Sequence, residues 1–214
     1  MRAPQAKLYY IHDPMCSWCW AFNPVRERLF GRLGDSVGIE FVLGGLAPDT
    51  DQPMPEELRS KIQQIWRTIE VEVPGTHFNY DFWTNCHPRR STLAACRAVI
   101  AAARQAPELE REMVLAIQIA YYCEAKNPSD IPVLIDLAVA LGLDRKKFSE
   151  DLESSDTAGE LSRQIALARN MSVRAFPSLV LQDRGCAYQL LEIDYHNIEG
   201  MLEQIGAPVK WRSA

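Results

Sequence analysis

The sequence has no uninterrupted apolar run of about 18 residues, the length that a membrane-spanning helix needs. It also has no long block of one charge, since 23 basic and 28 acidic residues are interspersed and give a net charge of −5. This balance disfavours a nucleic acid or a membrane as the main partner. No apolar leader with a small-residue cleavage site follows the first residues, so we expect a cytoplasmic protein. The 47% of apolar residues among 214 suffices for a globular core.

Six cysteines are present, and two of them stand at a spacing that indicates chemistry. Cys16 and Cys19 form a Cys-Ser-Trp-Cys motif between a buried-strand pattern at 7–12 and a helical pattern at 17–33. A cysteine at the start of a helix meets unpaired N–H groups and the positive end of the helix dipole, which stabilise a thiolate. Cys19 lies one turn deeper on the same face, so it can resolve a mixed disulfide formed at Cys16. The other four are interpreted as core thiols: Cys86, Cys96, Cys123 and Cys186.

Two other interpretations of the pair stay open. A zinc site needs two further ligands from a similar cluster, and the adjacent Cys86 and His87 have no partners at the usual spacing. The pair can also be two inert buried cysteines, although such a pair seldom falls by accident at a strand-to-helix junction. We therefore favour redox use and expect no metal.

The order of the patterns predicts a mixed α/β fold with a helical insertion. The strand and helix around the cysteines continue into a second strand at 38–43, which makes a right-handed βαβ unit. About a hundred residues without a convincing strand follow, and strand character returns at 178–182 and 187–191 before a last helix at 198–205. We predict one domain from 1–54 and 172–214, and an all-helical domain at 55–171.

The insertion is predicted to consist of consecutive helices with one irregular aromatic segment at 74–88. The last helix of the insertion, at 157–171, is expected to begin with a capping box formed by Thr157 and Glu160. The helical patterns of the insertion lie at 55–71, 91–105, 107–125, 132–141, 145–152 and 157–171.

Phe176 and Pro177 directly precede the third strand pattern. A proline is tolerated as the first residue of a strand, which is one interpretation. A cis peptide bond is the other, and the position of this proline relative to the cysteine motif and the closing strands favours it.

The segment at 13–20, Asp-Pro-Met-Cys-Ser-Trp-Cys-Trp, resembles the active-site segment of DsbA-family thioredoxin-fold proteins. It is most similar to the cytoplasmic branch of DsbA-like oxidoreductases and disulfide isomerases, and Ala-Phe-Pro-Ser-Leu-Val at 175–180 resembles the cis-proline loop of that family. The resemblance implies an α/β thioredoxin-like fold with an inserted helical domain. It implies a thiol–disulfide oxidoreductase with Cys16 as nucleophile and Cys19 as resolving thiol.

The same resemblance implies how a substrate binds. Pro177 would face the cysteines, and the backbone of Phe176 would pair with an extended substrate peptide. Trp18 adds an apolar surface between the two cysteines. We expect protein or small-molecule thiols and disulfides as partners, with glutathione as a redox partner and no other cofactor.

Two other functions on the same fold stay open. Glutathione-dependent transferases or isomerases of the kappa type resemble this fold, but they usually carry serine in place of Cys16 and have no Cys19. Some cytoplasmic relatives are not enzymes and act as adaptors that deliver a regulator to a protease.

Other polar side chains near the motif have two interpretations each. His12 can sense the thiolate or pack against the sheet, and Asp13 can accept a proton or form a turn; packing is favoured for His12. The aromatic residues at 77–83 line a groove or pack the insertion, and packing is again favoured. A solvated helix start is favoured over an acidic-substrate site for three arginines: Arg89, Arg90 and Arg97.

Overall fold

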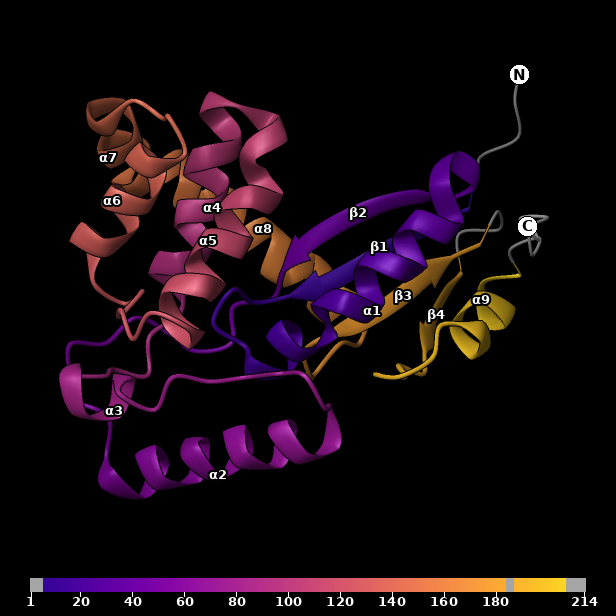
Figure 1. The fold of residues 1–214 in the computed structure, drawn as a ribbon. Helices are drawn as coiled ribbons and strands as arrows, with labels where there is room; N and C mark the ends of the chain where they lie inside the picture. The colour runs from indigo at the N-terminus through magenta and orange to yellow at the C-terminus, as the bar shows by residue number, and fades with distance from the viewer. Residues whose placement is uncertain (1–5, 184–186, 207–214) are drawn as a thin grey trace.

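The computed structural model describes residues 6–183 and 187–206 (Figure 1). Its strands are β1 (Lys7–His12), β2 (Gly38–Leu43), β3 (Ser178–Gln182) and β4 (Tyr188–Leu191). The α-helices are α1 (Ser17–Leu33), α2 (Glu56–Glu72), α3 (Phe82–Asn85), α4 (Leu93–Gln105), α5 (Glu110–Tyr122), α6 (Ile131–Ala140), α7 (Arg145–Glu153), α8 (Ser155–Asn170) and α9 (Glu199–Ile205), with short 3₁₀ turns at Gly34–Ser36 and Pro107–Leu109. The predicted order of strand, helix, strand, helices, two strands and a helix is confirmed.

The four strands form one sheet in the order β2-β1-β3-β4. β1 runs parallel to β2, with His12 opposite Leu43, and antiparallel to β3, with Ile11 opposite Ser178. The carboxyl ends of β1 and β2 therefore lie at the same edge of the sheet as the start of β3. Three loops meet at this edge, and they carry the cysteine motif, Gly44 and Pro177.

Side chains of β1 alternate between the two faces of the sheet, as the two-residue period of a strand requires. Leu8 and Tyr10 pack with apolar residues of α1 and α9, whereas Tyr9 and Ile11 pack on the opposite face with the end of α8. Figure 1 shows α1 and α9 on one side of the sheet and α8 on the other. Because both faces are covered, β1 is buried almost throughout, and this fixes the position of the loop that follows it.

The helices between β2 and β3 have a core of their own around Trp66 of α2. The Trp66 side chain is fully buried, and its rings stack on Phe78 with centroids 4.8 Å apart. Phe82 and Trp83 are buried in the same cluster, so the expected packing role of the aromatic segment is confirmed for these residues, while His77 is exposed. Met15, next to Cys16, joins this cluster and connects the cysteine loop to the insertion.

Two local predictions are wrong. The aromatic segment expected to be irregular contains the short helix α3. Helix α8 begins before Thr157, because the side chain of Ser154 accepts a hydrogen bond from the Thr157 N–H at 3.2 Å and caps the helix, so the capping box predicted at Thr157 does not form. The thiol of Cys186, interpreted from the sequence as a core thiol, falls outside the described residues. Among the residues described, no helix has the length and apolar character that crossing a bilayer requires.

Candidate active site

Cys16 is the N-cap residue of α1. Its backbone is extended, with φ −86° and ψ 117°, and its carbonyl accepts the first helical hydrogen bond from the Trp20 N–H at 3.1 Å. The Cys16 N–H in turn donates to the Asp13 carbonyl at 3.0 Å, which closes the turn after β1. This position places Cys16 at the positive end of the helix dipole, where a negative charge is stabilised, although its side chain makes no capping hydrogen bond.

The Cys16 thiol faces the loop before β3. Its Sγ lies 3.4 Å from the carbonyl oxygen of Phe176, and the peptide bond between Phe176 and Pro177 is cis. Cys16 is 5% exposed, and Pro177 is buried beside it. Residues 160 positions apart in the sequence thus meet because β3 begins where β1 ends.

Cys19 lies one helical turn further along α1 and is fully buried. Burial raises the pKa of the Cys19 thiol well above its ordinary value, and the neighbouring Cys16 thiol raises that pKa further. Cys19 is therefore held as a neutral thiol at neutral pH. Both cysteines are free thiols in the structure: Cys16 at the helix end is 5% exposed, and the protonated Cys19 behind it is fully buried.

The carboxyl group of Asp13 organises the loops behind the cysteines. It is fully buried and accepts hydrogen bonds from the Met15 N–H at 2.8 Å, the Leu46 N–H at 2.7 Å and the Thr92 hydroxyl at 2.7 Å. The Cys96 thiol lies 3.4 Å from the same oxygen as Thr92. Burial raises the pKa of Asp13, although these hydrogen bonds act in the opposite direction. Asp13 therefore does more than form a turn, since it joins the cysteine loop, the loop after β2 and helix α4.

His12 packs against the sheet, as favoured from the sequence. Its ring stacks on Tyr10 with centroids 5.0 Å apart and meets Phe41 edge to face. Burial, assisted by the nearby Arg26 guanidinium, lowers the pKa of His12 to about 3. The ring is therefore neutral at physiological pH.

The ring of Phe176 lies directly on Gly44, the first residue after β2. A Cβ added to Gly44 would lie 2.1 Å from two ring carbons of Phe176. Only glycine leaves room for this approach, so Gly44 is part of the site. The sequence patterns alone assign Gly44 no role in the site.

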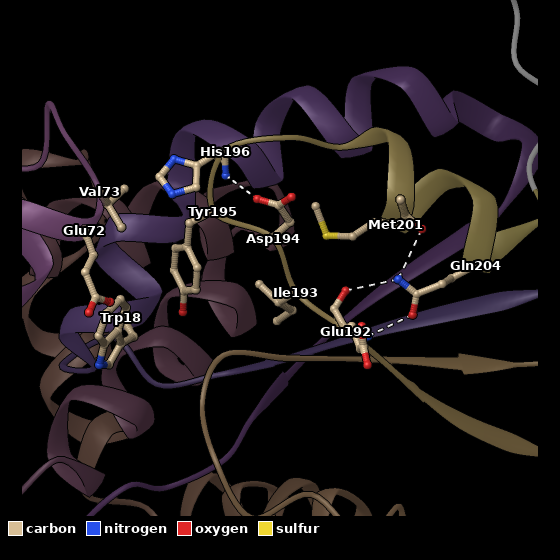
Figure 2. Close-up of a pocket in the computed structure, with 11 residues that line it drawn as sticks. Trp18, Glu72, Val73, Glu192, Ile193, Asp194, Tyr195, His196, Met201 and Gln204 are labelled. Atoms are coloured by element: carbon tan, nitrogen blue, oxygen red, sulfur yellow. Dashed lines mark hydrogen bonds between the residues drawn. The ribbon is translucent and has the colours of Figure 1, made fainter.

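Trp18, between the two cysteines, borders a pocket of about 450 Å³ that is also lined by residues 192–196 (Figure 2). Its ring meets Tyr195 edge to face with centroids 5.2 Å apart, so Trp18 is half-buried and not a free apolar surface. The pocket also contains three carboxylate side chains: Glu72, Glu192 and Asp194. These come from α2 and from the segment between β4 and α9, and no motif in the sequence connects them.

The arginines considered from the sequence are held by acidic neighbours. Arg89 forms an ion pair with Asp130 at 2.5 Å, and Arg97 forms one with Asp49 at 2.7 Å. Arg89 lies shortly before α4 and Arg97 lies within it, and both side chains are only partly exposed and held in these ion pairs. Within residues 6–183 and 187–206, no three His, Cys, Asp or Glu side chains are arranged to hold a metal ion.

The cysteines outside the motif differ from one another in burial. Cys96 is fully buried, as expected of a core thiol, whereas Cys86 is half-buried and donates to the Ala125 carbonyl at 3.1 Å. The core assignment is wrong for Cys123, which is exposed because it follows the last residue of α5 on the solvent side.

The sheet order, the cysteine pair at the start of α1 and the facing cis-proline together define a thioredoxin-fold protein. The chain belongs to the thioredoxin family, because the family model described as Thioredoxin matches residues 9–199. Crystal structures of DsbA oxidoreductases share this fold, so the resemblance to DsbA-like proteins is confirmed. The predicted α/β thioredoxin-like fold is confirmed as well, while the domain limits at 55 and 171 stay a prediction.

Two solved structures cover nearly the whole chain. A Nitrosomonas europaea protein, provisionally named a protein disulfide isomerase, is 27% identical with a TM-score of 0.81 over 95% of this chain and 97% of that one. The cytosolic disulfide reductase DsbM from Pseudomonas aeruginosa, solved with GSH, is 24% identical with a TM-score of 0.70 over 94% of this chain and 96% of that one.

Curated relatives carry a different kind of name. The ClpXP adapter protein SpxH of Halalkalibacterium halodurans is 26% identical over 178 residues, which are 81% of this chain and 58% of that protein. The chain thus spans less than two thirds of the length of these relatives, and SpxH of Bacillus subtilis is matched in the same way at 24% identity.

Proposed function

We propose that this protein is a thiol–disulfide oxidoreductase in which Cys16 and Cys19 exchange disulfides with thiol partners. The observation that carries the proposal is the position of the Cys16 sulfur, at the start of α1 and 3.4 Å from the Phe176 carbonyl beside a cis-proline. The helix end stabilises the thiolate, which is the nucleophilic form of cysteine.

The reaction follows from the different burial of the two thiols. The Cys16 thiolate attacks one sulfur of a disulfide, so that a mixed disulfide forms and the other half leaves as a thiolate and takes up a proton. Cys19 then loses its proton and attacks the Cys16 sulfur, which releases the second half as a thiol. The substrate gains two electrons, and the protein retains the Cys16–Cys19 disulfide. Two molecules of glutathione can reduce this disulfide and become glutathione disulfide.

The raised pKa of Cys19 orders these steps. A protonated Cys19 is not a nucleophile, so Cys16 attacks the substrate disulfide first, and Cys19 attacks the resulting mixed disulfide only when a base removes its proton. The buried Asp13 lies next to the motif; a hydrogen bond with its backbone lowers the pKa of Cys19, and the charge of its carboxylate raises that pKa to a lesser extent.

Substrate is proposed to bind along the cis-proline loop. The Phe176 backbone can pair with an extended peptide, because it directly precedes β3 and its carbonyl already faces Cys16. Trp18 forms the opposite border of this site beside the pocket of Figure 2. Glutathione as a partner is supported by the neighbour solved with GSH, and that neighbour's name as a cytosolic reductase supports a cytoplasmic setting.

Turnover of a model disulfide tests the proposal. The purified protein should reduce bis(2-hydroxyethyl) disulfide in the presence of glutathione, and Cys16→Ser should abolish this activity. Cys19→Ser should instead accumulate a stable mixed disulfide on Cys16, visible by mass spectrometry. Cys123→Ser is the matched control, because it removes an exposed thiol outside the site and should leave the rate unchanged. Equal activity of wild type and Cys16→Ser would contradict the proposal.

A second candidate function is that of a protease adapter, which the names of the curated relatives favour. An adapter role requires a docking surface and no thiol chemistry. The Cys16→Ser/Cys19→Ser double variant separates the two functions. If it still accelerates proteolysis of a bound client by ClpXP, the adapter function is supported independently of the redox pair.

A further inference from the structure

A second pocket lies on the other side of the cis-proline loop from Trp18. It has a volume of about 490 Å³, and its walls come from the loop after β2, the end of α8 and the segment that leads to Phe176. Phe176 itself lines this pocket, while its carbonyl oxygen accepts the contact from Cys16. A substrate paired with the Phe176 backbone therefore lies next to the pocket.

The polar groups of this pocket are cationic. Arg169 and Arg174 line it together with Ser172, and the rest of the lining is glycine or apolar side chains, without a carboxylate. Both arginines are exposed, and neither guanidinium has a hydrogen bond or an ion pair within the described part of the chain. Two arginines of the helical insertion differ, since Arg89 and Arg97 are held by Asp130 and Asp49.

The helix dipole of α8 explains the position of only one of these two arginines. Arg169 lies in the last turn of the helix, where the helix dipole favours a cation. Arg174 follows four residues after the helix ends, on the way to the cis-proline, so the dipole does not explain its position. Two unpaired guanidinium groups on one cavity suit a carboxylate, which guanidinium groups bind through paired N–H donors.

The two sides of the site thus have opposite charge. The Trp18 pocket carries the side chains of Glu72, Glu192 and Asp194, and the Phe176 pocket carries two arginines. A substrate that places an anionic group near Trp18 meets repulsion, whereas the same group near Phe176 meets attraction. This asymmetry gives a bound thiol a preferred orientation.

We propose that the Arg169–Arg174 pocket is a carboxylate subsite, which selects thiols and disulfides with a carboxylate one or two residues from the reacting sulfur. The inference rests on the proposed redox function. An extended residue spans about 3.3 Å, so such a carboxylate reaches the pocket while the sulfur stays at Cys16. A small peptide thiol and an acidic protein segment share this chemistry.

The test compares two disulfides of different charge. Glutathione disulfide carries carboxylates, and bis(2-hydroxyethyl) disulfide is neutral. We expect Arg169→Gln/Arg174→Gln to lower kcat/KM for glutathione disulfide about fivefold to tenfold at low salt, and to leave the neutral disulfide unchanged. Lys146→Gln/Lys147→Gln on α7 is the matched control, because it removes two exposed positive charges far from the motif in sequence and should change neither rate.

Peptide disulfides with Glu or Gln two residues from the cysteine distinguish the two sources of the carboxylate. If the double arginine variant loses kcat/KM with the Glu peptide, the pocket is assigned to acidic protein segments. If it loses kcat/KM with glutathione disulfide alone, the pocket is assigned to a small peptide thiol. If the double arginine variant loses kcat/KM equally for charged and neutral disulfides, or loses none for any charged disulfide, the inference is overturned while the redox function stands. Failure of the wild-type protein to turn over either disulfide would overturn both.

Discussion

Replacing Gly44 with alanine tests how the cis-proline loop is held. The new Cβ would lie 2.1 Å from two ring carbons of Phe176, while ordinary contacts begin at 3.4 Å. The ring must therefore move by more than about 1 Å, since atoms at that distance repel strongly. The ring borders a pocket and has room to rotate, so we expect a modest loss of about 1 kcal/mol in the free energy of unfolding.

The effect on catalysis should be larger than the effect on stability. Phe176 supplies the carbonyl that faces Cys16, and a displacement of about 1 Å in a positioning group can lower a rate about 100-fold. We expect disulfide turnover by Gly44→Ala to fall about tenfold or more. The assay is turnover of bis(2-hydroxyethyl) disulfide with glutathione, together with urea unfolding of the same samples.

A double-mutant cycle identifies the cause of the loss. If the clash with the ring is responsible, Gly44→Ala should cause little further loss of stability in a Phe176→Ala background. The coupling in the free energy of unfolding is then about 1 kcal/mol. Gly159→Ala is the control, because a Cβ at that position in α8 meets nothing within 4 Å and should slightly stabilise the helix. Additive effects of Gly44→Ala and Phe176→Ala, or wild-type turnover by Gly44→Ala, would refute the reasoning.

Three further predictions concern the frame of the site. Asp13→Ala leaves the N–H groups of Met15 and Leu46 and the Thr92 hydroxyl without their acceptor, so urea unfolding should show a loss of about 3 kcal/mol, and a loss below about 1 kcal/mol would contradict this role. The pKa of His12 falls from 6.5 to about 3 on folding, so as the pH is lowered the unfolded chain takes up a proton that the folded chain does not. The free energy of unfolding should therefore decrease by about 1.4 kcal/mol per pH unit well below pH 6.5. The raised pKa of Asp13 acts with the opposite sign, so comparison with His12→Phe, which should flatten the decrease, isolates the histidine; an unchanged slope would contradict it. Trp66→Ala should cost about 3–5 kcal/mol by opening a cavity in the helical core, and thermal unfolding near the wild-type temperature would rule this out.

The sequence predicts the fold and the two cysteines well because short-range patterns define them. The strand at Lys7–His12, the helix after Cys16 and the order of the closing strands follow from periodicity and from a motif of four residues. The likeness to DsbA-like proteins rests on the same segments and is confirmed by the fold.

The surroundings of the cysteines depend on long-range contacts that no local pattern reveals. Asp13 is bound by Leu46 and Thr92, which lie 33 and 79 residues away, and Gly44 is required by the ring of Phe176. The glycine pair after the second strand was the available signal for this contact, but it is equally typical of a loop. The Ser154 cap was missed because Thr157, three residues later, offers the same local pattern.

The most direct test of the redox account is the equilibrium between the Cys16 and Cys19 thiols and glutathione buffers of graded potential. Samples are trapped with acid, labelled with a thiol reagent and mapped by mass spectrometry. The account predicts one two-electron transition, in which both residues lose their label together and a peptide linked through Cys16 and Cys19 appears. Labels that persist on both residues across the whole range of buffers, or oxidation of Cys16 alone, would contradict it.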